Sequence, residues 1–278
     1  DTYNFIQNNN SITNNSKTLM HNKIFIFDNK KVMTGSANIS PTGLTYNSNI
    51  VAFINSKDIA NQYLNEFEKM YNKNFSTYKT TQKNQPINFN NSSIQIFFQP
   101  KDDIYNNLIS NEIKNAKKEI FISIFYLTDK NLIQELINAK KRGVNVLILI
   151  DSLGAMNFKE RIKLLRNENI PVKVENWGGK NHEKTIMIDS KILIFGSCNF
   201  SKSGFYKNDE NIVVINNNEI AQFYKKYFLD LFNSIDKKYL KLFPRAEGKD
   251  SINSCFDGID NNFDGKTDLE DEGCKSIK

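Results

Sequence analysis

The stretches NHEKTIMIDSKILIFGSCN at 181–199 and HNKIFIFDNKKVMTGSAN at 21–38 decide the fold of this 278-residue chain. They contain the two histidines of the whole sequence. A shift of 161 positions aligns 21–72 with 182–233 without a gap. Identities recur along this alignment, including His21/His182, Lys23/Lys184, Asp28/Asp189, Gly35/Gly196, Ser36/Ser197, Asn38/Asn199, Gly43/Gly204 and Asn47/Asn208. The sequence therefore contains a duplicated structural unit.

The second copy, residues 94–236, alternates strand-like and helix-like segments. Apolar runs predict strands at 94–98, 119–125, 145–151 and 171–175, a hairpin over 184–195 and a last strand at 211–215. Helical patterns predict helices near 103–117, 131–143, 157–167 and 217–233. This alternation predicts an α/β sandwich around a mixed sheet.

The first copy, residues 1–75, is shorter than the second. Twenty residues precede His21, whereas about 88 residues of the second copy precede His182. The missing part would be a strand–helix–strand–helix–strand section, so we expect a first half that is truncated at its N-terminal side. The polar segment 76–93 is expected to link the two halves.

Charge is distributed unevenly along the chain. Residues 250–278 carry eight acidic side chains and three lysines, which leaves 34 basic and 23 acidic residues, a net of +11, in residues 1–249. A basic body suits a polyanionic partner, such as nucleic acid or an anionic membrane surface. An Asn-, Lys- and Ile-rich composition alone would also produce extra lysines. The longest apolar runs, such as 144–150, fall short of the roughly 18 residues of a spanning helix.

The repeated histidines and lysines have a spacing that suits phosphate chemistry. Residues i and i+2 of a strand share a face, so His21 and Lys23, and likewise His182 and Lys184, project side by side. Such a pair is costly to bury in an apolar core. Beside a phosphate, the ammonium group neutralises oxygens while the imidazole attacks or donates a proton.

The pattern H-x-K-x4-D followed by G-S-x-N resembles the HKD motif of the phospholipase D superfamily, here in two copies. The segment FISIFYLTDKNLIQELINAKKRGVNVLILID is similar to the nuclease-like branch of that superfamily. The resemblance implies two phospholipase D-like halves related by a pseudo-twofold axis, with one shared site. It implies a catalytic set that comprises His21, Lys23, Asp28, His182, Lys184 and Asp189, although strand parity favours anchoring of the hairpins for Asp28 and Asp189.

In this family, one histidine attacks phosphorus to form a phosphohistidine, and the other protonates the leaving oxygen. The resemblance assigns phosphate binding to Ser36, Asn38, Ser197 and Asn199, and it implies no catalytic metal, because the lysines hold the charge. A carboxylate about 28 residues after the histidine often holds its Nδ1–H. Glu210 fills that position for His182, whereas Asn49 stands there for His21, so we expect His182 to be the nucleophile and His21 the acid.

The acidic tail, 250–278, predicts a bound calcium ion. Residues 260–271 fit the template D-x-N-x-D-G, with Asp260, Asn262, Asp264, the Lys266 carbonyl, Asp268 and Asp271 as ligands. The tail resembles the cysteine-bracketed DGxDNDxDG calcium repeats of secreted bacterial proteins. Cys255 and Cys274 are expected to form a disulfide, whereas Cys198 is expected to be a buried thiol. These features predict an exported protein, extracellular or periplasmic, with structural calcium.

Three functions are compatible with these motifs. The first is a phosphodiesterase that acts on DNA or RNA, favoured by the basic body and by polar loops such as 151–161. The second is a phospholipase D that cleaves phospholipid headgroups at a membrane surface, and the third is a binding module without activity. We favour the nuclease, because a lipid enzyme should carry apolar loops that enter the interface. As a pseudo-dimer within one chain, the full-length protein is expected to be monomeric.

Overall fold

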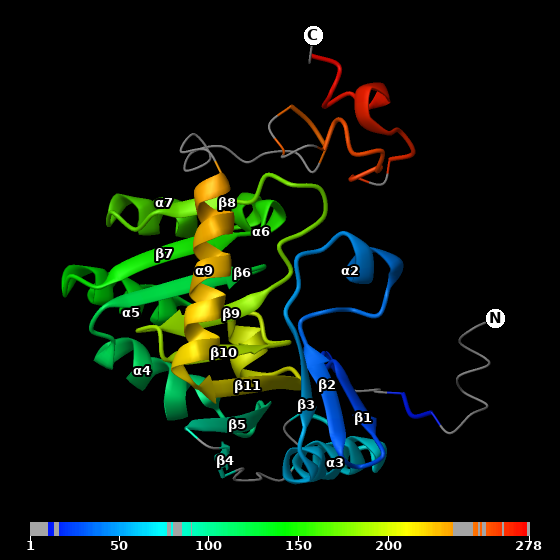
Figure 1. Ribbon diagram of the computed structural model, residues 1–278, viewed down its shortest axis with the longest axis vertical. Coiled ribbons are helices and arrows are strands. Elements are labelled where there is room, and N and C mark those ends of the chain that lie inside the picture. The colour runs from blue at the N-terminus through cyan, green and yellow to red at the C-terminus, as the bar shows by residue number, and fades with distance from the viewer. Residues whose placement is uncertain are drawn as a thin grey trace.

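A computed structural model shows two sheets that correspond to the two halves of the repeat (Figure 1). The structure describes residues 11–13, 17–76, 79, 85–89, 91–235, 247–249, 251, 254–262 and 264–276. Within these residues, no helix is long and apolar enough to cross a membrane. The α/β sandwich predicted from the sequence is confirmed, with a mixed sheet in the second half.

The second half is built around an eight-stranded sheet with the order β4-β5-β11-β10-β9-β6-β7-β8. Its strands are β4 (Ile87–Phe89), β5 (Ser92–Gln99), β6 (Glu119–Ile124), β7 (Asn145–Ile150), β8 (Val172–Val174), β9 (Lys184–Ile188), β10 (Ile192–Gly196) and β11 (Glu210–Asn216). Strands β6, β7 and β8 are parallel, whereas β9 runs antiparallel to β6. This antiparallel pairing brings the beginning of β9 beside the carboxyl end of β6, where His182 precedes Lys184.

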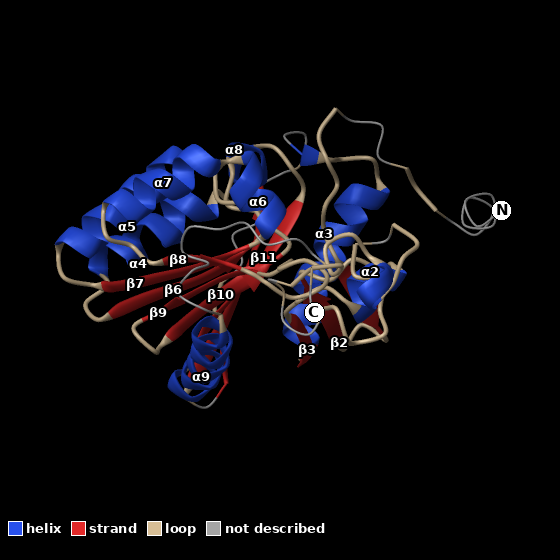
Figure 2. Ribbon diagram, turned by 90° about the horizontal axis from the view of Figure 1, so that it is seen from above, coloured by secondary structure: helices blue, strands red, loops and turns tan. Residues whose placement is uncertain are grey.

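Helices cover both faces of this sheet (Figure 2). One face carries α4 (Ser110–Asn115), α5 (Lys130–Lys141), α6 (Ser152–Asn157), α7 (Lys159–Asn167) and α8 (Lys202–Tyr206), and the other carries α9 (Asn218–Ser234). A π-helical turn, Tyr105–Ile109, precedes α4, so the predicted helix at 103–117 is present in two pieces. Helix α6 is an addition to the predicted elements. Asp151 caps its N-terminus by accepting hydrogen bonds from the Leu153 and Gly154 amides.

The first half is a three-stranded antiparallel sheet, β1 (Ile24–Phe27), β2 (Lys31–Gly35) and β3 (Val51–Asn55), with α2 (Pro41–Thr45) and α3 (Lys57–Tyr71). The two halves also share the way in which their short helices are capped. Ser40 and Ser201 cap α2 and α8, and each accepts a hydrogen bond at 3.1 Å from a glycine amide, Gly43 or Gly204. The described first half contains no counterpart of β6, α5 or β7.

One hydrophobic core joins the two halves. It combines Val32, Ile59 and Tyr63 of the first half with residues of β5, β10, β11 and α9 in the second. A second core lies within the second half, between the sheet and helices α4, α5, α7 and α8. The shared core fixes the two HKD-like motifs relative to each other, as a site between the halves requires.

The two sheets differ in whether helices pack on their outer faces. Val214 on β11 is 7 % exposed and belongs to the second-half core, whereas its repeat counterpart on β3, Phe53, is 75 % exposed. Ile188 and Phe27 differ in the same way, at 2 % and 44 %. The helix layer of the second half therefore has no equivalent over the described first-half sheet.

The linker predicted at 76–93 is partly structured. Residues 87–89 form β4, which pairs with β5 at the edge of the large sheet, so the second half begins earlier than residue 94. The prediction failed because a short edge strand of polar composition has a weak alternating pattern. Residues 77, 78, 80–84 and 90 lie outside the described residues.

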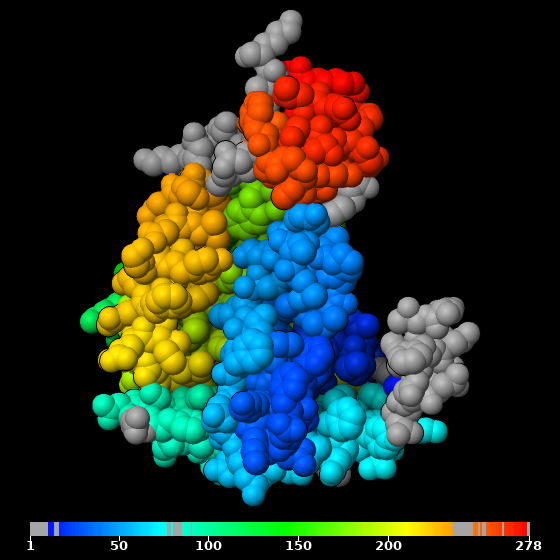
Figure 3. Space-filling model, turned by 45° about the vertical axis from the view of Figure 1, so that its right-hand side comes forward, coloured from blue at the N-terminus to red at the C-terminus, as the bar shows by residue number. Residues whose placement is uncertain are grey.

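The acidic tail lies at one end of the two halves (Figure 3). Cys255 and Cys274 form the predicted disulfide, with their Cα atoms 5.7 Å apart. The tail contacts the second half directly, since a Cβ at Gly178 would lie 1.6 Å from Asn261 Oδ1. Gly178 stands four residues before His182, so the tail packs against the loop that leads into the second motif.

Candidate active site

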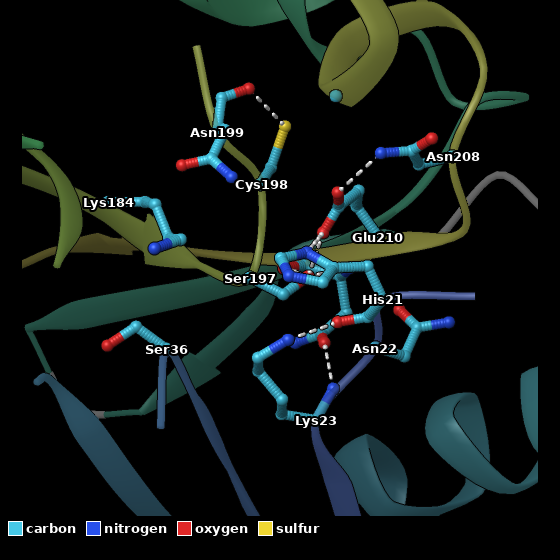
Figure 4. A network of polar contacts seen from close by, with 12 residues as sticks. His21, Asn22, Lys23, Ser36, Lys184, Ser197, Cys198, Asn199, Asn208 and Glu210 are labelled. Atoms are coloured by element: carbon cyan, nitrogen blue, oxygen red, sulfur yellow. Dashed lines mark hydrogen bonds and ion pairs between the residues drawn. The ribbon is translucent and has the colours of Figure 1, made fainter. Parts of the chain in front are cut away.

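The two motifs present matching His–Lys pairs at the beginnings of β1 and β9. Lys23 Nζ donates a hydrogen bond to the His21 carbonyl at 2.8 Å, and Lys184 Nζ donates to the His182 carbonyl at 2.7 Å. Each lysine thus lies beside its own histidine, as the i, i+2 spacing predicts. Figure 4 shows the His21 ring pointing toward Glu210, with Lys23 on its other side and Lys184 across the site.

Each histidine is held by the backbone of the other half. The His21 amide donates to the Asp209 carbonyl at 2.9 Å, and the His182 amide donates to the Ser48 carbonyl at 2.9 Å. Ser48 and Asp209 are themselves repeat counterparts, so the two contacts are related by the pseudo-twofold axis. The shared site predicted from the sequence is therefore built by segments that cross from one half to the other.

Glu210 pairs with His21, and not with His182 as predicted. Its Oε2 atom lies 2.8 Å from His21 Nδ1, and its side chain is fully buried. The prediction was wrong because a carboxylate in the same sequence unit is not the one in contact. The crossing of the halves places residues 209–211 beside 21–23. The Nδ1–H of His21 donates to this carboxylate, which leaves Nε2 facing the site.

Asn49 holds the equivalent position at His182. The Nδ1 atom of His182 lies 3.0 Å from the Ser36 carbonyl and 3.3 Å from Asn49 Oδ1, and a carbonyl oxygen can only accept. His182 therefore carries its proton on Nδ1, and its Nε2 atom is available. The two rings have the same orientation but different partners, a carboxylate for His21 and neutral oxygens for His182.

The serines of the two G-S-x-N segments position these partners. Ser36 Oγ donates to Asn49 Oδ1 at 2.8 Å, and Ser197 Oγ donates to Glu210 Oε2 at 2.5 Å. Each hydroxyl also accepts a backbone amide hydrogen bond. The direct phosphate contact predicted for Ser36 and Ser197 is thus replaced by a positioning role, because both hydroxyls are already occupied.

The two asparagines of these segments remain candidates for phosphate binding. Asn199 Oδ1 is buried without a hydrogen-bond partner in the described structure. Asn38, its repeat counterpart, is exposed. Side-chain amide groups at these positions could donate to non-bridging oxygens, as predicted.

Asp28 and Asp189 lie away from the histidines. The Asp189 carboxylate accepts the Lys117, Lys118 and Glu119 amides at 2.9, 2.7 and 3.0 Å and so holds the beginning of β6. Asp28 lies in the tight β1–β2 turn with a φ of 51°. The Asp189 contacts are those of an anchor, which strand parity favours, and among the described residues no hydrogen bond joins either carboxylate to a histidine.

The site concentrates positive charge in a buried environment. Burial, and then the nearby Lys23 ammonium, lowers the pKa of Lys184 to about 7. Burial also lowers the pKa of Lys23 to about 8, although Glu210 opposes this shift. The pKa of His182 is lowered to about 2 by burial, by Lys184 and by Lys23. Cations crowded in this way fit an anionic ligand, whose charge would offset their repulsion.

Cys198 lies within the second motif but has no catalytic geometry. Its side chain is buried, and burial raises the pKa of its thiol well above the usual value. The thiol is therefore the inert buried group expected from the sequence.

Some, but not all, of the tail residues predicted to bind calcium contact one another. Asn262 Nδ2 donates to Asp271 Oδ2 at 2.7 Å, and Asp260 accepts the Asp264 and Gly265 amides at 3.2 and 2.8 Å. Asp268 instead accepts the Asp257 amide at 3.1 Å. Across the described residues, no three His, Cys, Asp or Glu side chains are grouped as metal ligands. The calcium site stays a prediction.

Comparison with known proteins identifies the family of this chain. The family described as "Cardiolipin synthase, PLD-like domain" matches residues 3–71 and 109–232, which is more than half of the chain. The chain belongs to this phospholipase D-like family. Both matched segments include one of the two motif histidines, in agreement with the duplicated unit.

Two proteins are similar to this chain in sequence, and one solved structure is similar to it in fold. "Phospholipase D" of Rickettsia conorii is 33 % identical over 122 residues, which are 44 % of this chain and 61 % of that protein. "Mitochondrial cardiolipin hydrolase" of Xenopus laevis is 25 % identical over 138 residues, 50 % of this chain and 66 % of that protein. Phosphatidylserine synthase of Haemophilus influenzae shares the fold, with a TM-score of 0.60 and 15 % identity over 76 % of this chain and 62 % of that one. The chain thus spans about three fifths of the length of its first relatives.

Proposed function

We propose that this protein hydrolyses phosphodiester bonds through a phosphohistidine intermediate, with nucleic acid as its substrate. The observation that carries the chemistry is the meeting of two His–Lys pairs from opposite halves in one buried, positively charged site. A phosphodiester anion between the two lysines would restore their full charge. Lys23 and Lys184 would then stabilise the additional charge of the transition state.

His21 is the proposed nucleophile. Attack of Nε2 on phosphorus leaves a positive charge on the ring, and the Glu210 carboxylate at 2.8 Å from Nδ1 compensates for it. The sequence predicted His182 as the nucleophile because Glu210 was expected to contact it. In the structure Glu210 contacts His21, so the assignment is reversed. The new P–N bond forms as the bond from phosphorus to the leaving oxygen breaks.

His182 is the proposed acid and base. Its Nε2–H protonates the leaving oxygen, and the same atom then takes a proton from water as the water attacks phosphorus and the P–N bond breaks. The low pKa of His182 in the free protein makes its protonated form a strong acid. The negative charge of the bound substrate would raise that pKa and supply the protonated form.

The charge of the body supports a nucleic-acid substrate. Residues 1–249 carry a net charge of +11, which would attract a chain of phosphates along its length. The relatives named phospholipase D and cardiolipin hydrolase favour a second candidate substrate, the headgroup ester of a phospholipid. The catalytic groups suit both substrates, so the distinction lies outside the His–Lys pairs.

Parallel assays test the proposal. Labelled plasmid and single-stranded DNA are incubated with the protein in EDTA, beside liposomes that contain phosphatidylcholine or cardiolipin. Release of DNA fragments by the wild type, and not by a Lys184→Met variant, would support the nuclease. Headgroup release alone would establish the lipid enzyme. Turnover of neither substrate would favour the binding module.

We also propose structural calcium in the tail and export from the cell. Asp260, Asn262, Asp264 and Asp271 would hold the ion, with the Lys266 carbonyl, while Asp268 would first have to leave its contact with the Asp257 amide. The Cys255–Cys274 disulfide supports an oxidising compartment. Detection of the protein in culture medium, or in a periplasmic fraction, tests the location.

A further inference from the structure

A row of three aromatic rings runs from His182 to the protein surface. The Phe125 ring centroid lies 5.2 Å from that of His182, and Tyr126 follows at 4.2 Å from Phe125. Phe158 continues the row, with its centroid 5.6 Å from Tyr126. Exposure rises from 9 % at Phe125 to 37 % at Phe158, so the row connects the buried site with solvent.

The row is placed by the carboxyl ends of parallel strands. Phe125 and Tyr126 directly follow β6, and Phe158 lies between α6 and α7, which follow β7. A Cβ at Gly154 would lie 2.0 Å from the Phe125 carbonyl, so α6 packs tightly against this backbone. The Phe200 amide donates to the Tyr126 carbonyl at 3.1 Å. The rings are therefore supported by rigid elements.

The Phe125 ring is buried, Tyr126 is partly buried, and Phe158 is exposed. Neither of the two hydrophobic cores of the described structure includes Phe125, Tyr126 or Phe158. Phe121 and Phe205, by contrast, are members of a core. An aromatic row outside the cores, with one end at a catalytic histidine, has the placement of a ligand contact.

Two lysine ammonium groups near the aromatic row disfavour a positively charged ligand. Lys184 Nζ lies 5.1 Å and Lys180 Nζ 5.8 Å from the Phe125 ring centroid. A quaternary ammonium headgroup, which would also bind an aromatic face, would be repelled by these two ammonium groups. A neutral, planar base that is linked to phosphates suits both the rings and the lysines.

We infer that Phe125, Tyr126 and Phe158 form a subsite that stacks on the base of the leaving nucleotide. This inference rests on the proposed nuclease function and on His182 as the acid. The leaving oxygen must lie beside the group that protonates it, so the leaving nucleotide lies on the side of His182 and of the aromatic row. Rings at the surface end would contact bases without reading their sequence.

The experiment uses single-stranded DNA decamers in which the bases are either present or replaced by abasic residues. For the full chain we expect kcat/KM to be about tenfold higher with bases, mainly through KM. Tyr126→Ala and Phe158→Ala should bring this ratio toward one, chiefly by raising KM for the decamer that carries bases. Tyr126→Phe should retain the preference, and Phe223→Ala, at a 77 % exposed position on α9, serves as the matched control.

A strand with one thymine among abasic residues tests the side of binding. Cleavage should occur next to the thymine, and mass analysis should find the base on the fragment that leaves with a free hydroxyl. The inference fails if the thymine is on the fragment that keeps the phosphate. It also fails if the variants slow both decamers equally, with thermal unfolding showing that they are folded. Hydrolysis of liposomes but of neither decamer would overturn the nuclease proposal, and the subsite with it.

Discussion

The His21 and His182 halves of the chain carry the same motif, yet they surround it differently. His21 is paired with a buried carboxylate, Glu210, whereas His182 faces the Ser36 carbonyl and the Asn49 amide oxygen. The aromatic row flanks His182, and the described first half has no counterpart of the strand end that supplies it. The difference indicates that the two histidines have different chemical roles, although the two motifs have the same backbone arrangement.

The strongest test of this inequality is removal of each histidine. With a p-nitrophenyl phosphodiester, whose leaving group needs no proton, His182→Ala should still release a burst of nitrophenol. His21→Ala should lower activity by about 10⁴-fold or more and show no burst, because no P–N bond can form. Stopped-flow absorbance checks this, with peptide mass mapping of the trapped phosphoenzyme. A label on His182 would contradict the assignment.

The partners at the repeat positions 49 and 210 give the next comparison. Glu210→Gln should lower kcat by about 10²-fold, because the neutral amide cannot compensate for the cationic phosphohistidine. Asn49→Ala should cost about tenfold, since the Ser36 carbonyl still holds the His182 ring. Steady-state kinetics with one DNA substrate measures both. Equal losses would mean that the two partners are equivalent.

The pH profile sharpens the same comparison. Burial and the two lysines lower the pKa of His182 to about 2, so its protonated form becomes more abundant as pH falls. If His182 is the acid, kcat/KM should rise toward acidic pH. Asn49→Asp adds a nearby negative charge and should shift this limb upward by about one pH unit. An Asn49→Asp profile that coincides with the wild-type profile would contradict the role of His182 as the acid.

Because helices bury the outer face of the second-half sheet but not that of the first-half sheet, equivalent substitutions on the two faces should differ in their effect on stability. Val214→Ala removes a side chain that is 7 % exposed and should lower the free energy of unfolding by about 2 kcal/mol. Phe53→Ala, at the counterpart that is 75 % exposed, should change it by less than about 0.5 kcal/mol. Urea unfolding of both variants provides the measurement. A large loss at Phe53 would show that its face is covered in solution.

The tail contacts the loop before His182 through Gly178, and a calcium ion bound in the tail should stabilise the protein modestly. Calcium at about ten times its dissociation constant should stabilise the folded tail by about 1.4 kcal/mol. Differential scanning calorimetry with EDTA or calcium measures this shift, and Asp264→Asn should reduce it. An unchanged transition in both proteins would remove the case for a calcium site.

Sequence reasoning succeeded where a feature is local or repeated. The His–Lys pairs, the hairpin role of Asp189 and the strand at 119–124 follow from spacing, apolar periodicity and duplication. The partner of Glu210 could not be read in this way, because residues 21 and 210 meet only when the halves cross. The occupied hydroxyls of Ser36 and Ser197 were missed for a similar reason, since their acceptors depend on tertiary contacts.

The signal for the aromatic row was present in the sequence but ambiguous. Phe125 and Tyr126 continue an apolar strand and would ordinarily be assigned to a core, and Phe158 stands in a polar loop. Their alignment toward His182 depends on the packing of α6 against β6. Repeat comparison gave no help, because the first half lacks the corresponding segment among its described residues.

The crossed backbone contacts, in which Asp209 holds His21 and Ser48 holds His182, have an evolutionary consequence. A gene that encoded a single unit could build such a centre only as a homodimer, where every mutation would alter both sides at once. Fusion of two units frees each side to mutate separately. The Glu210 and Asn49 pair is the kind of divergence that fusion permits, since an ancestral twin could not have kept a carboxylate at one side and an amide at the other.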